Sequence, residues 1–242
     1  MPVDIMLTVV ATTMIQSLFG AGVLLFGTPL LLLFGHGFVE VLVVLLPISI
    51  GINLLQIIKH HVHIDFAFYR NVLILTLPPI ALFLFLVTHA RINISLLIGV
   101  FLLFIACKEY SASIAKMLDR IMAFEKTYFL LMGIVHGVSN LGGSLLTALV
   151  HHKHYEKDAA RVTVAASYAT FAAVQLLTLW LFSAQQIDLS INHTAVYLLV
   201  GMLVFMLSDE MLYNALDRAK YQRFFAAFLA VSGLTLIVKS LN

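Results

Sequence analysis

The chain has 242 residues, of which 62% are hydrophobic and 11% are charged, and its mean hydropathy is +1.03. Soluble domains carry about 25% charged residues, so this composition excludes an ordinary soluble domain and predicts an all-α integral membrane protein. The formal net charge of +2 comes from residues in short connections and not from one basic patch, which argues against nucleic acid as a partner.

Eight apolar segments follow one another along the chain. Backbone polar groups in hydrocarbon must bond within their own segment, so each segment is expected to be helical. Most approach the roughly 17–25 residues that a membrane-spanning helix needs. No polar or Pro/Ser-rich linker divides them, which predicts a single membrane domain over residues 1–242. The segments cover approximately residues 5–34, 38–58, 71–87, 92–107, 128–150, 162–182, 194–207 and 224–238.

The first and fifth segments differ from the others because glycines interrupt them. Residues 5–34 are too long for one ordinary span and contain Gly20-Ala21-Gly22 and Gly27-Thr28-Pro29. Residues 128–150 contain the polar, glycine-containing stretch 137–143. Glycine and proline interrupt helices, so both segments are expected to be broken helices or re-entrant hairpins.

The basic residues favour re-entrant hairpins, since cytoplasmic connections are enriched in Lys and Arg. If all eight segments crossed the membrane, the 14 basic residues would divide equally between its two sides. If the first and fifth segments enter and leave on the same side, only Arg91 and Lys239 lie opposite the others. This arrangement predicts six crossings, two hairpins entering from opposite faces, and both termini outside the cytoplasm.

An internal repeat follows from comparing the two interrupted segments. Gly20 aligns with Asn140 and Gly22 aligns with Gly142, and three apolar segments follow each interruption. The chain is therefore predicted to contain two inverted repeats, about residues 1–120 and 121–242. Each repeat is a broken or re-entrant helical hairpin followed by three transmembrane helices. Inverted repeats with discontinuous helices near the midplane are a recurrent transporter design.

At these interruptions the sequence resembles the TauE/SafE family of sulfite and organosulfonate exporters. The first-half pattern of that family is roughly G-x-G-G-G-x-x-x-x-P-x-L, and residues 20–31 keep two of the glycines and the proline at the same spacing. Apolar residues at 23 and 24 replace the other two glycines. The second-half pattern, roughly G-x-G-G-P, is similar to residues 140–144, with Asn140 and Ser144 as departures.

The resemblance implies a multi-pass permease of the inner cell membrane and not an enzyme. It implies a secondary transporter that exports a small sulfur-containing oxyanion, either sulfite or an organosulfonate. The expected partners are that anion and the lipid bilayer. The sequence leaves open a coupling proton or ion and a homo-oligomer, and it predicts no cofactor.

The expected substrate site lies between the two interruptions. An oxyanion loses its hydration shell in hydrocarbon, and unpaired N–H groups at helix amino termini supply a replacement without a charged side chain. Candidate residues at the interruptions are Gln16, Ser17, Gly20, Ala21, Gly22, Thr28, His136, Ser139, Asn140, Gly142, Gly143 and Ser144. Candidates from the following segments are Ser49, Asn53, Gln56, Ser167 and Tyr168, with Thr147, Thr170 and Gln175 as further polar residues near the same cavity.

Structural roles compete with these assignments. The glycines also suit close helix packing, and any single polar residue also suits an interhelical hydrogen bond. His136 is either a titrating group or a neutral structural histidine. Arg161 is expected to orient the chain or to attract anions to a vestibule. Asp209 lies at the end of an apolar segment and is expected to be solvated.

Two histidine clusters suggest a different class of protein. They are His60-His61-Val62-His63 and His151-His152-Lys153-His154. Imidazole is a common ligand of transition metals, so the alternative function is a membrane-embedded metalloenzyme of the lipid hydroxylase or desaturase kind. The closely paired histidine motifs of those enzymes are absent, and neither cluster contains Cys, Asp or Glu. The favoured interpretation places both clusters at the membrane surface, with no metal.

Overall fold

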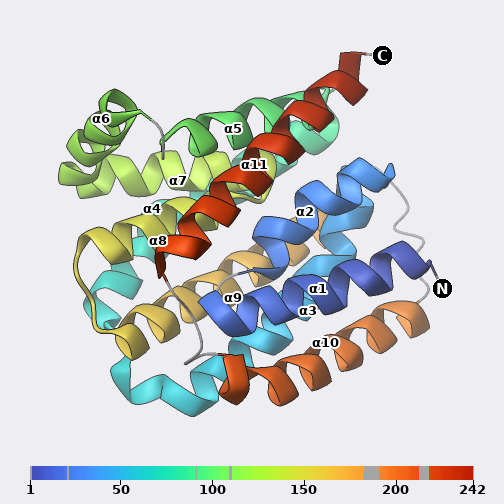
Figure 1. The fold of residues 1–242 in the computed structure, drawn as a ribbon, viewed down its shortest axis with the longest axis horizontal. Helices are drawn as coiled ribbons and strands as arrows, with labels where there is room; N and C mark the ends of the chain where they lie inside the picture. Colours follow the sequence, from blue (N-terminus) through green and yellow to red (C-terminus); the bar gives the residue numbers. More distant parts are fainter. Residues whose placement is uncertain are drawn as a thin grey trace.

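The computed structural model describes residues 2–20, 22–90, 92–108, 111–182, 191–212 and 218–241. In these ranges the chain forms α-helices and one short 3-10 helix, with no strand (Figure 1). The all-α fold predicted from the sequence is confirmed. The α-helices are α1 (Val3–Phe19), α2 (Val23–Phe34), α3 (Phe38–His60), α4 (Phe66–His89), α5 (Ile94–Lys108), α6 (Ala112–Ala123), α7 (Glu125–Ser139), α8 (Gly142–His152), α9 (Lys157–Phe182), α10 (Ile191–Leu212) and α11 (Arg218–Leu241).

Three of these helices are long and apolar enough to cross a membrane by themselves. They are α3 extended through the 3-10 turn, α4 and α9, with 26, 24 and 26 residues. Shorter apolar stretches of 10–17 residues belong to α1, α2, α5, α10 and α11 in the part of the chain that is described. Large apolar side chains such as Trp180, Leu203 and Val231 are more than half exposed, as expected for surfaces that face lipid.

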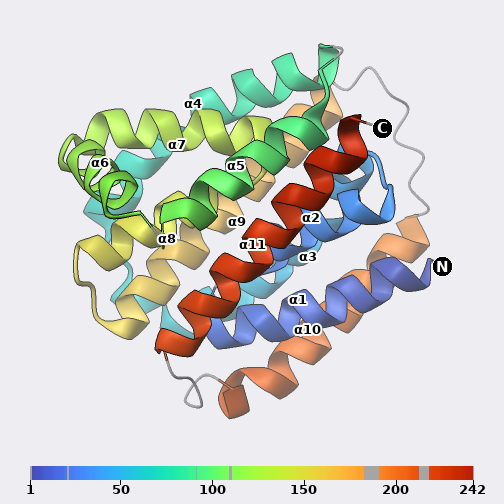
Figure 2. The same cartoon turned by 45° about the horizontal axis from the view of Figure 1, so that its top comes forward.

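The connections between helices lie at two opposite ends of the helix bundle, which we call the first end and the second end. Hydrogen bonds and ion pairs show which connections share an end. At the first end, Asn93 near the start of α5 donates to Ser240 O at 3.0 Å, close to the end of α11. At the second end, Tyr155 before α9 donates to Asp65, which also accepts from Phe68 N and caps α4. Figure 2 shows the two termini at the first end, opposite the turn between α8 and α9.

The two hairpins enter the bundle from opposite ends. The start of α1 meets the turn after α2 through Asp4 and His36, whose side-chain atoms lie 2.7 Å apart. The start of α7 meets the end of α8 through Glu125 and Lys153, which form an ion pair of 2.8 Å. Hairpin 1 (α1 and α2) therefore opens toward the first end, and hairpin 2 (α7 and α8) opens toward the second end (Figure 1).

The connection between the halves contains a helix that the apolar pattern does not reveal. Ser111 accepts from Ile114 N and caps α6, whose Leu118 and Met122 are buried while Lys116 is exposed. A bend of 113° at Phe124 separates α6 from α7. The segment is too short and too charged to read as a span, but its apolar residues follow a helical period.

Helices of the two halves pair in corresponding ways. α10 packs on α1 and α3, and α4 packs on α7 and α9. The third helix of each half packs on the third helix of the other, which is the contact of α3 with α9. The last helices, α5 and α11, pack on each other in the same way. At the latter contact a Cβ on Gly99 would lie 2.9 Å from Gly233 O, and a Cβ on Gly233 would lie 2.8 Å from Gly99 O. Small residues thus allow a close approach between α5 and α11.

Candidate functional site

Both hairpins reverse direction through a residue in the left-handed conformation. α1 ends at Gly20, with φ 75°, whose N–H donates to Gln16 O at 2.7 Å. α7 ends at Asn140, with φ 62°, whose N–H donates to His136 O at 2.8 Å. Glycine adopts this conformation freely, and asparagine tolerates it better than most residues. The two breaks are therefore the same turn, at the two positions that the sequence comparison pairs.

In both breaks the returning chain lies against the last turn of the helix before it. A Cβ on Gly22 would lie 2.6 Å from Gln16 N, and a Cβ on Gly142 would lie 2.5 Å from His136 Cβ. Real Cβ atoms do not come this close to other heavy atoms. Both glycines are therefore needed for the returning chain to lie against the preceding helix, whether or not they also contact a substrate.

At the first break, Gln16 links the hairpin to α3. Its Oε1 accepts from Val23 N at 3.0 Å, so the first N–H of α2 is already capped. Its Nε2 donates to Asn53 Oδ1 at 3.0 Å, and Asn53 Nδ2 donates to Ser49 Oγ at 3.0 Å. Gln16, Asn53 and Ser49 thus form a buried chain of polar side chains, in which Gln16 and Asn53 are each at most 2% exposed.

At the second break, His136 takes the place of Gln16 and contacts α9. Its Nε2 lies 3.1 Å from Gln175 Oε1, and its ring lies 5.0 Å from the ring of Phe171. The turn itself reaches the other hairpin, because Asn140 Nδ2 donates to Thr28 Oγ1 at 3.0 Å. This bond joins the tip of hairpin 2 directly to α2.

At the start of α8, Gly143 is buried and the ring of Tyr168 lies over it. A Cβ on Gly143 would lie only 1.5 Å from the hydroxyl oxygen of Tyr168. Glycine at this position allows the phenol to approach the first turn of the helix. Ser144 Oγ donates to Leu141 O at 2.8 Å and fixes the turn. The phenol hydroxyl of Tyr168 and the first turn of α8 are thus brought to one place.

Several buried polar atoms around the breaks have no hydrogen-bond partner. Gln56 stands out because its side chain is buried at 2% exposure and neither amide atom is paired. Buried polar groups are nearly always paired, so these unpaired atoms are available to a water molecule or a polar ligand. Within the described residues, these atoms include Thr13 Oγ1, both amide atoms of Gln56, His136 Nδ1, Asn140 Oδ1, Thr147 Oγ1 and Gln175 Nε2.

The structure groups some of the predicted site residues and separates others. Gln16, Ser49 and Asn53 form one group, and Thr28 and Asn140 form another. Gly143 with Tyr168, and His136 with Gln175, lie at the second break. Ser139 and Ser167 each bond a backbone oxygen four residues earlier in their own helix. Ala21 lies outside the described residues.

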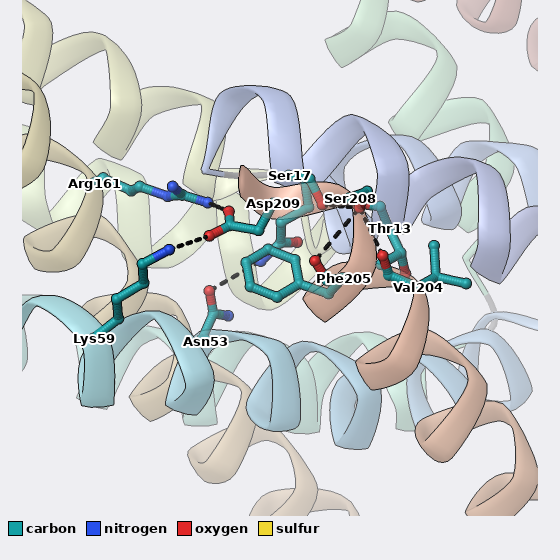
Figure 3. A network of polar contacts seen from close by, with 10 residues as sticks. Thr13, Ser17, Asn53, Lys59, Arg161, Val204, Phe205, Ser208 and Asp209 are labelled. Carbon is teal, nitrogen blue, oxygen red and sulfur yellow. Dashed lines mark hydrogen bonds and ion pairs between the residues drawn. The ribbon is translucent and has the colours of Figure 1, made fainter. Parts of the chain in front are cut away.

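Ser17 contacts a helix that the sequence did not connect with the site. Its hydroxyl lies 2.6 Å from the hydroxyl of Ser208 on α10. The next residue on α10, Asp209, pairs with Arg161 on α9 and with Lys59 on α3, the latter at 3.3 Å (Figure 3). The side chains of Arg161 and Asp209 are 4% and 8% exposed. The expectation that Asp209 is solvated is wrong, because the carboxylate lies between two cations.

To predict this charged cluster from the sequence, one would have to know which acidic residue pairs with which basic residue. Arg161 and Asp209 flank different apolar segments and are 48 residues apart. An acidic residue and a basic residue at the edges of apolar segments are a weak sign of an ion pair, because burying either charge alone is costly. Nothing local to either residue identifies its partner.

The histidine clusters do not converge. The part of the chain that the structure describes contains no group of three His, Cys, Asp or Glu side chains placed to hold a metal ion. His61 Nδ1 lies 3.3 Å from Ile58 O, and His152 lies 4.0 Å from Asp119. Both clusters are largely exposed at the second end of the bundle.

Comparison with known proteins identifies the family. Neither the curated proteins nor the solved structures include a significant match to the chain. Residues 5–236 match the family described as sulfite exporter TauE/SafE, which is nearly the whole chain. The match covers both hairpins and all the helices that pack around them. The chain belongs to the TauE/SafE sulfite exporter family, and the protein is a multi-pass membrane transporter.

Proposed function

We propose that the protein exports a small sulfur-containing oxyanion, sulfite or an organosulfonate, through a site between the two helix breaks. The observation that carries this proposal is the repeated turn at Gly20 and Asn140 inside an apolar bundle. Each turn places the side chain four residues before it, Gln16 or His136, against a polar residue of the following long helix. Discontinuous helices that face each other across two halves form the substrate sites of many transporters.

The second break is the better donor surface for the anion. At the first break the Val23 N–H is already bonded to Gln16. At the second break the hydroxyl of Tyr168 lies over Gly143 in the first turn of α8, and Gln175 Nε2 is an unpaired buried donor. Neutral donors hold an oxyanion without the strong binding of a full positive charge, so the site also releases its cargo.

The membrane orientation belongs to the same proposal. Lys59, Lys153 and Arg161 lie at the second end, together with other basic residues of the connections. Since cytoplasmic connections are enriched in basic residues, the second end faces the cytoplasm and both termini face outward. The two halves are then inverted repeats, and the corresponding packing of their helices supports this relation.

Binding to the purified protein tests the substrate class. Sulfite and methanesulfonate, which share a pyramidal or tetrahedral sulfur head with several terminal oxygens, are compared with nitrate and acetate of similar size. We expect saturable binding of the sulfur anions and at least tenfold weaker binding of the planar anions. Equal binding of all four would contradict selectivity for sulfur oxyanions. Tight binding of stoichiometric iron would instead favour the metalloenzyme.

A further inference from the structure

The charged cluster at the second end holds one carboxylate between two cations. Asp209 Oδ1 accepts from Arg161, and Asp209 Oδ2 accepts from Lys59 Nζ at 3.3 Å (Figure 3). The Lys59 side chain is 46% exposed, whereas those of Arg161 and Asp209 are almost fully buried. The three side chains therefore run from solvent into the bundle.

The cluster touches the tip of hairpin 1. A Cβ on Gly20 would lie 3.0 Å from Arg161 Cγ, so the arginine stem packs directly on the first break. Ser208, the residue before Asp209, contacts Ser17 near the end of α1 at 2.6 Å. Two consecutive residues of α10 thus connect this helix both to the hairpin tip and to Arg161.

A line of polar side chains leads from the cluster to the first break. Lys59, Gln56, Asn53 and Ser49 are spaced by three or four residues on α3 and therefore share one face of the helix. Gln56, in the middle of the line, is buried and both of its amide atoms lack partners. Asn53 is bonded to Gln16 at the break.

An oxyanion has the chemistry to replace Asp209 on Arg161. The guanidinium group binds carboxylates and other oxyanions through the same planar pair of N–H donors. Arg161 is buried and must keep an anionic partner, so an incoming anion is accepted most readily when it takes over the place of the carboxylate. This exchange leaves the total charge beside Arg161 nearly unchanged.

We propose that Lys59, Arg161 and Asp209 form an anion-exchange gate, in which the transported oxyanion displaces the Asp209 carboxylate from Arg161 and loosens α10 from the tip of hairpin 1. The proposal rests on the proposed function, because it gives the same anion an entry site. Lys59 attracts the anion from solvent, Arg161 binds it, and Gln56 lies next along the path. Loss of the Arg161 contact frees the Asp209 end of α10, and the Ser17 contact to Ser208 then opens.

Charge-neutralising variants test the exchange. We compare the affinity for sulfite and methanesulfonate in wild type, Asp209→Asn, Arg161→Gln and the charge-balanced double variant Arg161→Gln/Asp209→Asn. Asp209→Asn should bind at least tenfold more tightly, because the competing carboxylate is gone. Arg161→Gln and the double variant should bind at least tenfold more weakly. Thermal unfolding shows which variants keep the wild-type fold.

If either single variant fails to fold, the double variant still tests whether Arg161 binds the anion, because the double variant buries no unpaired charge. Wild-type affinity in the double variant would overturn the proposal, as would unchanged or weaker binding by folded Asp209→Asn. If wild type binds the sulfur anions and Asp209→Asn binds them no better, the gate is wrong and the proposed function stands. If wild type binds neither sulfur anion but Asp209→Asn gains binding of phosphate or acetate, the substrate is wrong and the gate stands. Absence of binding in all variants contradicts both.

Accessibility of Ser208 tests the mechanical part. In a Cys107→Ser background, Ser208→Cys should react faster with a maleimide when methanesulfonate is present, because α10 separates from hairpin 1. The same reporter combined with Arg161→Gln should show no such acceleration. A labelling rate that does not change with methanesulfonate in either background would contradict the opening of this contact.

Discussion

Gly143 shows how one missing methyl group shapes the second break. A Cβ at this position would overlap the hydroxyl oxygen and ring of Tyr168, at 1.5 Å and 1.7 Å. Tyr168 is 4% exposed and packs beside Phe171 and His136, so its ring has little room to move. Glycine at this position therefore allows the tyrosine ring to lie against the start of α8.

Gly143→Ala should lower the stability of the protein by about 1–3 kcal/mol, the usual cost of overpacking a core. Adding Tyr168→Ala removes the overlapping ring, so the double variant should lose less stability than the two single variants added together. Thermal or denaturant unfolding in detergent measures the difference. Strict additivity of the two substitutions would show that the contact between them is not the cause.

Asn140 combines a backbone role with a side-chain role, and two substitutions separate them. Asn140→Gly keeps the left-handed turn and loses the bond to Thr28, so it should cost about 0.5–1.5 kcal/mol of stability. Asn140→Ala loses the same bond and adds about 1–2 kcal/mol for a non-glycine residue in that conformation. Unfolding measurements should therefore rank alanine below glycine. The reverse order would contradict the left-handed turn.

At the scale of elements, a polar contact bridges the mouth of each hairpin. His36 joins Asp4 of α1 and Glu40 of α3 at the first end, and its side chain is only 16% exposed. Lys239 lies beside this mouth and donates to Leu33 O at 3.0 Å. Desolvation disfavours the charged imidazole, but hydrogen bonds to Asp4 and Glu40 outweigh it and raise the pKa of His36.

A raised pKa in the folded state makes the His36 contact a source of stability at low pH. Its contribution is complete below the ordinary histidine pKa of about 6.5 and is lost as the pH rises through the higher folded value. The melting temperature of wild type should exceed that of His36→Gln by more at pH 6 than at pH 9. His63→Gln, at an exposed histidine, is the control for loss of an imidazole. A His36 difference that grows with pH would contradict this account.

The elements that the sequence predicts well are those with a strong apolar signal. The apolar segments and both interruptions correspond to helices and helix breaks in the structure, because glycine and αL geometry act locally. α6 was missed because twelve residues with several charges carry no membrane signal. The pairing of Arg161 with Asp209 was missed because tertiary packing alone brings α9 beside α10.

For the whole molecule, the charge distribution predicts orientation, and cysteine labelling measures it. In a Cys107→Ser background, Ser113→Cys and Lys153→Cys should both react only from the cytoplasm, since both lie at the second end. Ile92→Cys, in the connection before α5, should react only from outside. Labelling of positions 113 and 153 from opposite sides would require hairpin 2 to cross the membrane and would contradict the inverted arrangement.

The candidate site was predictable in outline and not in detail. The sequence indicates that polar residues gather around two glycine-containing breaks, and the structure joins Gln16 to Asn53 and Asn140 to Thr28. The sequence does not indicate that Gln16 caps the start of α2, because that hydrogen bond depends on the exact path of the chain after the break. The two breaks therefore differ in which side chain bonds the returning backbone, Gln16 at the first and Ser139 at the second.

The central claim is that the two breaks, and not the histidine clusters, hold the oxyanion. Its most direct test is the sulfite affinity of folded, monodisperse variants. Tyr168→Phe and Thr28→Ala each remove one hydroxyl, and loss of a hydrogen bond worth about 0.5–1.5 kcal/mol lowers affinity roughly two- to tenfold if the group binds the anion. Gly142→Val should lower it further, because the added side chain blocks the backbone.

Alanine at all the clustered histidines, 60, 61, 63, 151, 152 and 154, should leave the sulfite affinity within twofold of wild type, because these residues lie at the surface of the second end. Circular dichroism and thermal unfolding confirm that each variant keeps its fold. The account predicts weakened binding in the Tyr168 and Gly142 variants and unchanged binding in the histidine variant. Wild-type sulfite affinity in the Tyr168 and Gly142 variants, together with loss of binding in the histidine variant, would contradict the claim that the two breaks hold the anion.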